Sequence, residues 1–130
     1  MRTIRYIRIK QTRAIDSSKI HRHFKAAFNG CSMLEDVGAN LFDNVSTLAT
    51  YGFESVFSGC TSLTAQSVEN ILVSIAYACT NNGLTAPASP GNDLEIDYDT
   101  NTGSLSSATT TAIAICKTAG FDVVINGVSQ

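Results

Sequence analysis

The residues of this 130-residue chain that could support metal or nucleophilic chemistry are four cysteines and two histidines. The cysteines are 29, 19 and 37 residues apart, at Cys31, Cys60, Cys79 and Cys116. Zinc sites use closely spaced ligands such as a C-x-x-C pair, and none occurs here. His21 and His23 fall in a stretch that favours a helix, where residues i and i+2 diverge. We therefore predict neither a metal site nor a cofactor.

The cysteines are also the nearest candidates for a catalytic nucleophile. Each lies in an apolar stripe, where a free cysteine packs as a small hydrophobic residue, so we expect free thiols. Their even number leaves disulfides open in an oxidising compartment. A Gly-Cys pair occurs at equivalent positions of an internal repeat, which indicates packing. The sequence contains no G-x-S-x-G, no phosphate-binding glycine loop and no H-E-x-x-H motif, and we predict that the protein is not an enzyme.

The acidic stretch 93–101 is a candidate for calcium, because oxygen ligands alternate along it as they do in a calcium loop. Gly103, however, is one position beyond the glycine that such a loop requires. Ala108 stands where the final glutamate ligand would be. We therefore favour an acidic strand edge followed by a solvated turn, with calcium binding as the alternative.

Basic residues are concentrated at the N-terminus. Eight of the nine basic residues lie in the first 25 positions beside one acid, a net charge of +7, and the remaining 105 residues carry −9. Such an arm predicts an anionic partner or head-to-tail association of copies, with a solvated basic strand as the alternative. Nucleic acid is not favoured, because Tyr6 is the only aromatic residue before Phe24. The candidate partner-binding residues are Arg2, Arg5, Tyr6, Arg8, Lys10 and Arg13.

The elements that position these residues follow from periodicity. Residues 2–10 are rich in β-formers and predict a strand. From Ser67 to Cys79 apolar residues recur with helical spacing, and a second helix follows the Ser106-Ser107 cap and ends at Gly120. Residues 94–98 and 121–125 alternate as strands do, so the C-terminal part predicts a βαβ unit with parallel strands. The polar residues 126–130 would keep another copy from stacking on the last layer.

An internal repeat is the most specific feature. Residues 24–34 and 53–63 share the pattern F-x-x-[AV]-F-[NS]-G-C-[ST]-x-L at a spacing of 29 residues. Its apolar positions i, i+3, i+4 and i+7 predict a short helix that the glycine interrupts. A unit of this size cannot bury its apolar face alone, so the copies should stack and bury Phe28, Cys31, Phe57 and Cys60.

The F-S-G-C-T-S-L motif at 57–63 and the L-F-D-N segment at 41–44 resemble the BspA-like branch of the leucine-rich repeats. The resemblance covers about residues 24–127. Proteins of this branch are bacterial surface adhesins, phage virion proteins and protist surface proteins. The resemblance therefore implies a solenoid that recognises partners through one face, without catalysis.

Composition and these patterns together define one predicted architecture. With 44% hydrophobic residues, the chain can bury a single core. We expect an α/β fold: a short leucine-rich-repeat-like solenoid with a small parallel sheet, helices on one side and an N-terminal strand outside the repeats. Residues 1–23 form the basic arm, and 24–130 form the repeat domain with its C-terminal βαβ cap.

The predicted function is a non-enzymatic interaction module. We expect a bacteriophage virion structural protein, as a tail fibre or capsid decoration, that forms a homo-oligomer and contacts virion or host-surface proteins, with glycan as a further candidate. A fragment of a bacterial cell-surface leucine-rich repeat adhesin is the alternative. The chain has no run of about 18 apolar residues for a membrane span. Its first residues lack a signal-peptide core, which favours release by lysis in a virion over the cell surface.

Overall fold

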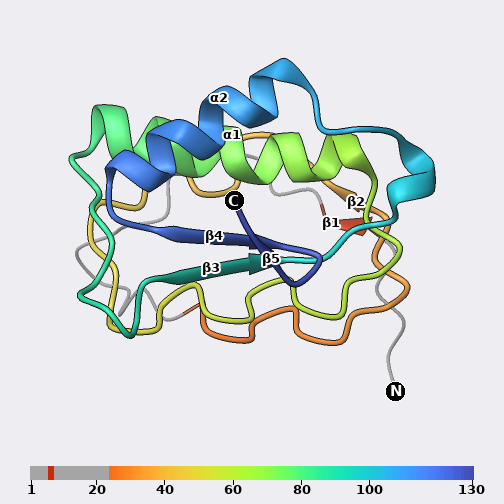
Figure 1. Ribbon diagram of the computed structural model, residues 1–130, viewed down its shortest axis with the longest axis horizontal. Helices are drawn as coiled ribbons and strands as arrows, with labels where there is room; N and C mark the ends of the chain where they lie inside the picture. The colour runs from red at the N-terminus through yellow and green to blue at the C-terminus, as the bar shows by residue number, and fades with distance from the viewer. Residues whose placement is uncertain (1–5, 8–23) are drawn as a thin grey trace.

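The structure is a computed structural model, and it describes residues 6–7 and 24–130. Within these residues the chain is a mixed α/β protein, in agreement with the predicted class. Helices α1 (Ala65–Asn81) and α2 (Ser107–Thr118) lie over one face of strands β3 (Asp93–Ile96) and β4 (Asp122–Ile125), as Figure 1 shows. No helix in the described part of the chain is long and apolar enough to cross a membrane.

The sheet around β4 is mixed and not purely parallel as predicted. Strands β3 and β4 pair in parallel from Asp93↔Asp122 to Ile96↔Ile125, which confirms the parallel strand pair of the predicted βαβ unit. Strand β5 (Val128–Ser129) then pairs antiparallel with β4. It follows a two-residue Asn-Gly turn with positive φ at both residues, the usual turn of a tight hairpin. The C-terminal residues therefore occupy the open edge of β4 by pairing with it.

Both helices begin and end near the predicted residues. The Thr64 side chain caps α1 by accepting a hydrogen bond from the Ser67 amide, and Ser106 caps α2 in the same way. The apolar stripe of α1 is fully buried along Val68, Ile71, Leu72 and Ile75. A 3-10 helix, η1 (Thr100–Thr102), occupies the turn expected between β3 and α2. The capping residue and the apolar residues of each helix lie within one short segment, so the sequence of that segment alone specifies the helix.

The two repeat copies are not short helices, so that prediction was wrong. Each copy is a succession of tight turns, in which hydrogen bonds span three residues, as between the Ala27 amide and the Phe24 carbonyl. A residue with left-handed backbone conformation recurs every few positions: Ala26 and Gly30 in the first copy have φ values of 55° and 76°. The second copy repeats this at Ser55 and Gly59, with 54° and 78°. These residues break the helical ladder, which needs φ near −63° throughout.

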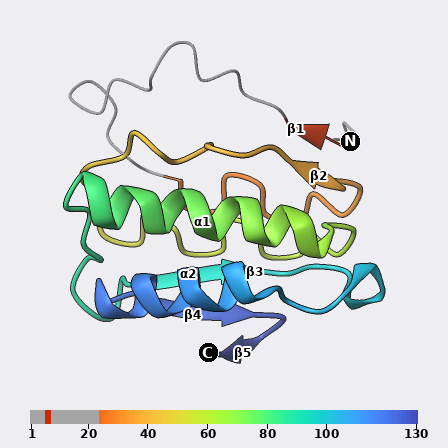
Figure 2. The same cartoon turned by 90° about the horizontal axis from the view of Figure 1, so that it is seen from above.

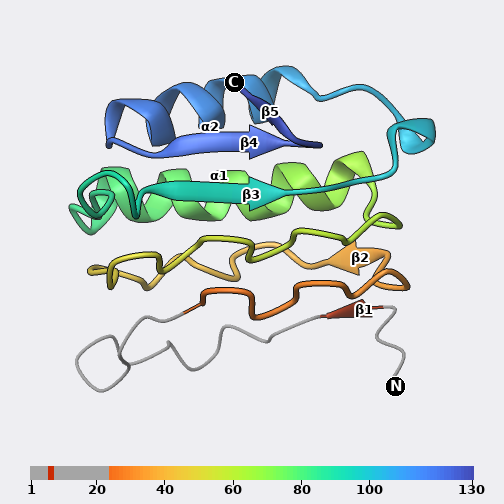
Figure 3. The same ribbon diagram turned by 60° about the horizontal axis from the view of Figure 1, so that its bottom comes forward.

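The backbone of the first copy donates its hydrogen bonds to the second copy. Alternate amides of residues 24, 26, 28 and 30 bond to the carbonyls of residues 52, 54, 56 and 58 at 2.8 to 3.0 Å. The second copy continues the layer into β3, because the Phe57 amide donates to the Glu95 carbonyl and the Asp97 amide donates to the Phe57 carbonyl, both at 3.1 Å. Figure 3 shows the first copy, the second copy, β3 and β4 side by side in this order.

Residues 29 positions apart lie one on the other. The rings of Phe28 and Phe57 stack with centroids 5.1 Å apart and planes 12° apart, and those of Phe24 and Phe53 stack at 5.6 Å and 21°. Phe57 and Cys60 are fully buried, as predicted. Phe28 and Cys31, also predicted to be buried, are only partly so. Among the described segments of this layer theirs is the outermost (Figure 3), with a described neighbour on one side.

Candidate interaction surfaces

The basic arm is described only at Tyr6 and Ile7. These two residues form β1, which pairs in parallel with β2 (Asp36–Val37) and so lies beside the body of the protein. This part of the predicted strand is therefore extended. The remaining members of the predicted set lie outside the described residues, as do both histidines: Arg2, Arg5, Arg8, Lys10 and Arg13; His21 and His23.

An acidic surface covers the face of β3 that points away from the core. Leu94 and Ile96 are completely buried, and strand alternation places Glu95 and Asp97 on the opposite face. Residues 24–130 contain two basic and ten acidic residues, a formal net charge of −8. A hollow of about 420 Å³ lies on this surface; its lining is Ser58, Thr61, Glu95, Asp97, Val124, Asn126 and Gly127.

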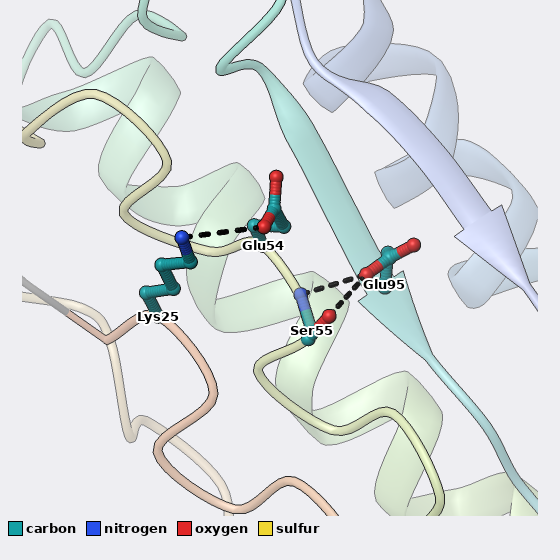
Figure 4. A network of polar contacts seen from close by, with 4 residues as sticks. All are labelled: Lys25, Glu54, Ser55 and Glu95. Carbon is teal, nitrogen blue, oxygen red and sulfur yellow. Dashed lines mark hydrogen bonds and ion pairs between the residues drawn. The ribbon is translucent and has the colours of Figure 1, made fainter.

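The carboxylates of this surface bind the turns of the second repeat copy. Glu95 Oε1 accepts hydrogen bonds from the Ser55 amide at 2.8 Å and from the Ser55 hydroxyl at 2.7 Å (Figure 4). Asp97 Oδ2 accepts one from the Gly59 amide at 2.7 Å. Both amides belong to left-handed residues, so β3 stabilises the turns where their backbone departs from regular structure. The sequence gives no sign of this pairing, because the partners are 40 and 38 residues apart.

A second set of contacts joins the two repeat copies on the same face. Lys25 Nζ lies 3.5 Å from a carboxylate oxygen of Glu54 (Figure 4). The same ammonium group lies 5.0 Å from the ring centroid of Tyr51, a cation–π contact. The Lys25 side chain is half exposed, so the ion pair adds little stability. The pair nevertheless links the two repeat copies on this polar surface.

The acidic residues repel one another around Asp93. Burial and then the charges of Asp122, Glu95 and Glu54 raise the pKa of the Asp93 carboxyl. The Asp99 carboxylate instead accepts a hydrogen bond from the Asn101 amide, 2.9 Å away, at the start of η1. The stretch 93–101 is thus a strand followed by a capped turn. In the part of the chain that the structure describes, no three histidine, cysteine or acidic residues come together to hold a metal.

The outer side of the helical layer carries an apolar surface. Two neighbouring grooves of about 490 and 470 Å³ run between α1 and α2. Their lining contains no charged side chain. Val73 and Tyr77 of α1 are 42% and 49% exposed beside the larger groove. This surface therefore differs in chemistry from the acidic face of β3.

The four cysteines are free. Cys31 and Cys60 occupy equivalent places in the repeat copies, and the Cys60 thiol donates a hydrogen bond to the Phe28 carbonyl at 3.0 Å. Burial, followed by the nearby Cys31, raises the pKa of Cys60 to about 12. Cys79 and Cys116 lie near the ends of α1 and α2. The repeat spacing in the sequence indicated the equivalence of Cys31 and Cys60.

No protein-family model, curated protein or solved structure matches this chain.

Proposed function

We propose that this protein is a non-enzymatic interaction module built as a short leucine-rich-repeat-like solenoid, and that it serves as a bacteriophage virion structural protein, a tail fibre or capsid decoration. In this role it contributes to particle assembly or to host attachment. The observation that carries the proposal is the register of the two repeat copies. Phe24 lies on Phe53 and Phe28 on Phe57, with alternate backbone amides bonded from copy to copy.

Stacking of this kind buries the large apolar side chains. Leu34, Leu63 and Phe57 are completely buried between the layers. What the stack presents outward is the acidic face of β3 on one side and the uncharged face of the helices on the other. Broad faces of this kind suit a protein partner, whereas catalysis needs converging acid, base and nucleophile.

The basic arm supplies the second part of the proposal. Residues 1–23 carry seven basic residues and one acid, whereas 24–130 carry a net charge of −8. Strand β1 places one point of the arm beside β2, at the far end of the molecule from β5, as Figures 2 and 3 show. The opposite net charges of the arm and of residues 24–130 favour head-to-tail contact between copies in a homo-oligomer.

Localisation of the native protein tests the virion role. Particles induced from the source culture are purified on a density gradient and labelled with an antibody against the full chain. We expect the protein to co-purify with intact particles and the label to decorate their surface in electron micrographs. Label confined to the cell envelope would favour the surface adhesin instead. Absence of the label from both the particles and the cell envelope would contradict an interaction role at either surface.

Deletion of residues 1–13 tests the arm separately. We expect the shortened chain to keep the circular dichroism spectrum of the full chain but to lose higher-order species in size-exclusion chromatography with light scattering. A matched control replaces only Arg2, Arg5 and Arg8 by glutamine, and so removes charge without removing the strand. Normal assembly of both variants would rule out a role of the arm in assembly. Loss of folding in the deletion variant alone would mean that β1 belongs to the structural core.

A further inference from the structure

The first repeat copy has an outer edge, which is the side of residues 24–31 that faces away from the second copy (Figure 3). The backbones of the two copies have the same form. The amides of residues 27, 29, 31 and 34 donate to the carbonyls three residues earlier, and the amides of residues 56, 58, 60 and 63 do the same. Each group on the outer edge therefore has an equivalent, 29 residues later, on the side of the second copy that the first copy covers.

The outer edge presents three backbone acceptors. In the second copy, the carbonyls of residues 54, 56 and 58 accept hydrogen bonds from the amides of residues 26, 28 and 30. Their equivalents are the carbonyls of Lys25, Ala27 and Asn29, to which no described residue donates. A segment that covers this edge must therefore bring amide donors at alternate residues.

The aromatic side chains of the outer edge are incompletely covered. Phe53 and Phe57 are completely buried because the rings of Phe24 and Phe28 stack on them. Phe24 and Phe28 themselves are only partly buried. Terminal repeats of solenoids usually end on a polar outer face, and these two rings depart from that rule. The covering segment should therefore carry two aromatic residues four positions apart.

The outer edge also leaves room for a glycine of the covering segment. A Cβ atom at Gly59 would lie 3.1 Å from the backbone of Gly30, which shows how closely the two copies approach at this turn. A Cβ atom at Gly30 would meet nothing within 4 Å. The equivalent approach on the outer edge is therefore open.

Lys25 gives the outer edge a preference for an acidic partner. Its ammonium group lies 3.5 Å from Glu54, which is the equivalent residue of the second copy. The Lys25 side chain is still 51% exposed, so it can face a second carboxylate in a covering segment. The second copy itself, F-E-S-V-F-S-G-C at 53–60, combines this acid with the two phenylalanines and the glycine.

We propose that the outer edge of the first repeat copy binds a third turn segment of the pattern F-[DE]-x-[AV]-F-[NS]-G, supplied by a partner protein. The binding continues the interface that already joins the two copies. A second molecule of this chain does not offer such a segment. Its amides of residues 26, 28 and 30 are bonded to the second copy, and those of residues 55, 57 and 59 are bonded to Glu95 and Asp97. The partner is therefore a different repeat protein, and this proposal rests on the interaction role proposed above.

The test titrates the full, isotope-labelled chain with a blocked peptide of residues 51–61 in reducing buffer and follows the backbone amides by NMR. We expect saturable shifts concentrated in residues 24–33, and none with a peptide of scrambled order. A peptide with Glu54→Lys should bind severalfold more weakly to the unaltered chain. The Lys25→Glu variant of the chain should restore the binding of that peptide.

Gly30→Ala blocks the outer edge most directly, because the new methyl group occupies the space that the glycine of the peptide needs. We expect about tenfold weaker binding of the peptide. Gly83→Ala is the matched control. Gly83 also has a left-handed φ, 70°, and open space beside it, but it lies beyond the end of α1. This variant should bind the peptide as the unaltered chain does, and circular dichroism verifies that both variants are folded.

Three results would overturn the proposed docking edge. They are the absence of saturable binding, equal binding by the Gly30→Ala variant, and shifts that lie outside residues 24–33. Shifts confined to residues 1–23 would mean that the acidic peptide is attracted only to the basic arm. Particle localisation and the deletion of residues 1–13 test the proposed function without this peptide, so the two proposals can fail separately.

Discussion

The repeat copies and the helical part of the molecule satisfy their backbone hydrogen bonds in different ways. Helix α1 satisfies its backbone within itself, from the Thr64 cap to the bond between the Asn82 amide and the Ala78 carbonyl. Residues 24–34 instead bond their alternate amides to the second copy. A helix is therefore specified by its own residues, whereas a turn segment is specified by its neighbour. Variants in the turn segments should accordingly act on two segments at once.

The largest effect is expected at Phe57, which is completely buried and stacked on Phe28. We expect Phe57→Ala to lower the free energy of unfolding by about 3 to 5 kcal/mol, through lost burial and the cavity left behind. Phe28→Ala is the matched control, because the same stacked pair loses its partly exposed member. Its cost in urea denaturation should be clearly smaller. Equal costs would mean that Phe28 is as deeply packed as Phe57.

A second effect tests the link between the turns and β3. Glu95→Ala removes the acceptor of the Ser55 amide and hydroxyl, and we expect a loss of about 1 to 3 kcal/mol in chemical denaturation. Glu95→Gln keeps an acceptor oxygen at the same place and should recover most of this loss. If glutamine were as damaging as alanine, the carboxylate charge and not its hydrogen bonds would hold the turn.

A helix cap gives the corresponding local effect. Ser106 accepts a hydrogen bond from the Thr109 amide, and its hydroxyl donates to Glu69 at 2.5 Å. Ser106→Ala should cost about 1 kcal/mol in thermal or urea unfolding, the usual value for a lost N-cap. Ser106→Asp keeps a capping oxygen but faces Glu69, so recovery should be partial. Hydrogen exchange should speed up in the first turn of α2 and leave residues 24–34 unchanged.

The smallest effect is a gain in stability at Asp93. The pKa of this carboxyl is raised in the folded protein, by burial first and then by Asp122, so its charge is destabilising and stability falls as pH rises above the ordinary aspartate pKa of 3.8. Asp93→Asn should therefore stabilise the protein slightly at neutral pH, and the gain should vanish at lower pH where aspartate is protonated. Unfolding curves across this range measure it. A loss at neutral pH would show that the carboxylate has a favourable partner.

The sequence predicted the helical part better than the turns for a physical reason. Thr64, Ser106 and the stripe from Val68 to Ile75 act within one element, and the parallel pairing of β3 and β4 followed from their order. The spacing of Phe24 and Phe28 fits a helix equally well. Only the left-handed backbone at Ala26, which no local signal marks, turns that pattern into stacked turns.

The candidate surfaces were predicted unevenly for a related reason. The alternation of the acidic strand was visible in the sequence. The Ser55–Glu95 hydrogen bonds join segments far apart in the chain, so the sequence could not predict them. Strand β5 was missed because two residues carry too little pattern, although the Asn-Gly turn before it was visible.

The most direct test of the stacked copies compares Gly30→Ala with Gly59→Ala. Both glycines have left-handed φ values, 76° and 78°, so alanine strains the backbone equally in each. A Cβ at Gly59 would lie 3.1 Å from the backbone of Gly30, whereas one at Gly30 would meet nothing within 4 Å. Stacking of the copies at a spacing of 29 residues predicts that Gly59→Ala lowers the free energy of unfolding more than Gly30→Ala. Equal losses would contradict the stacked arrangement.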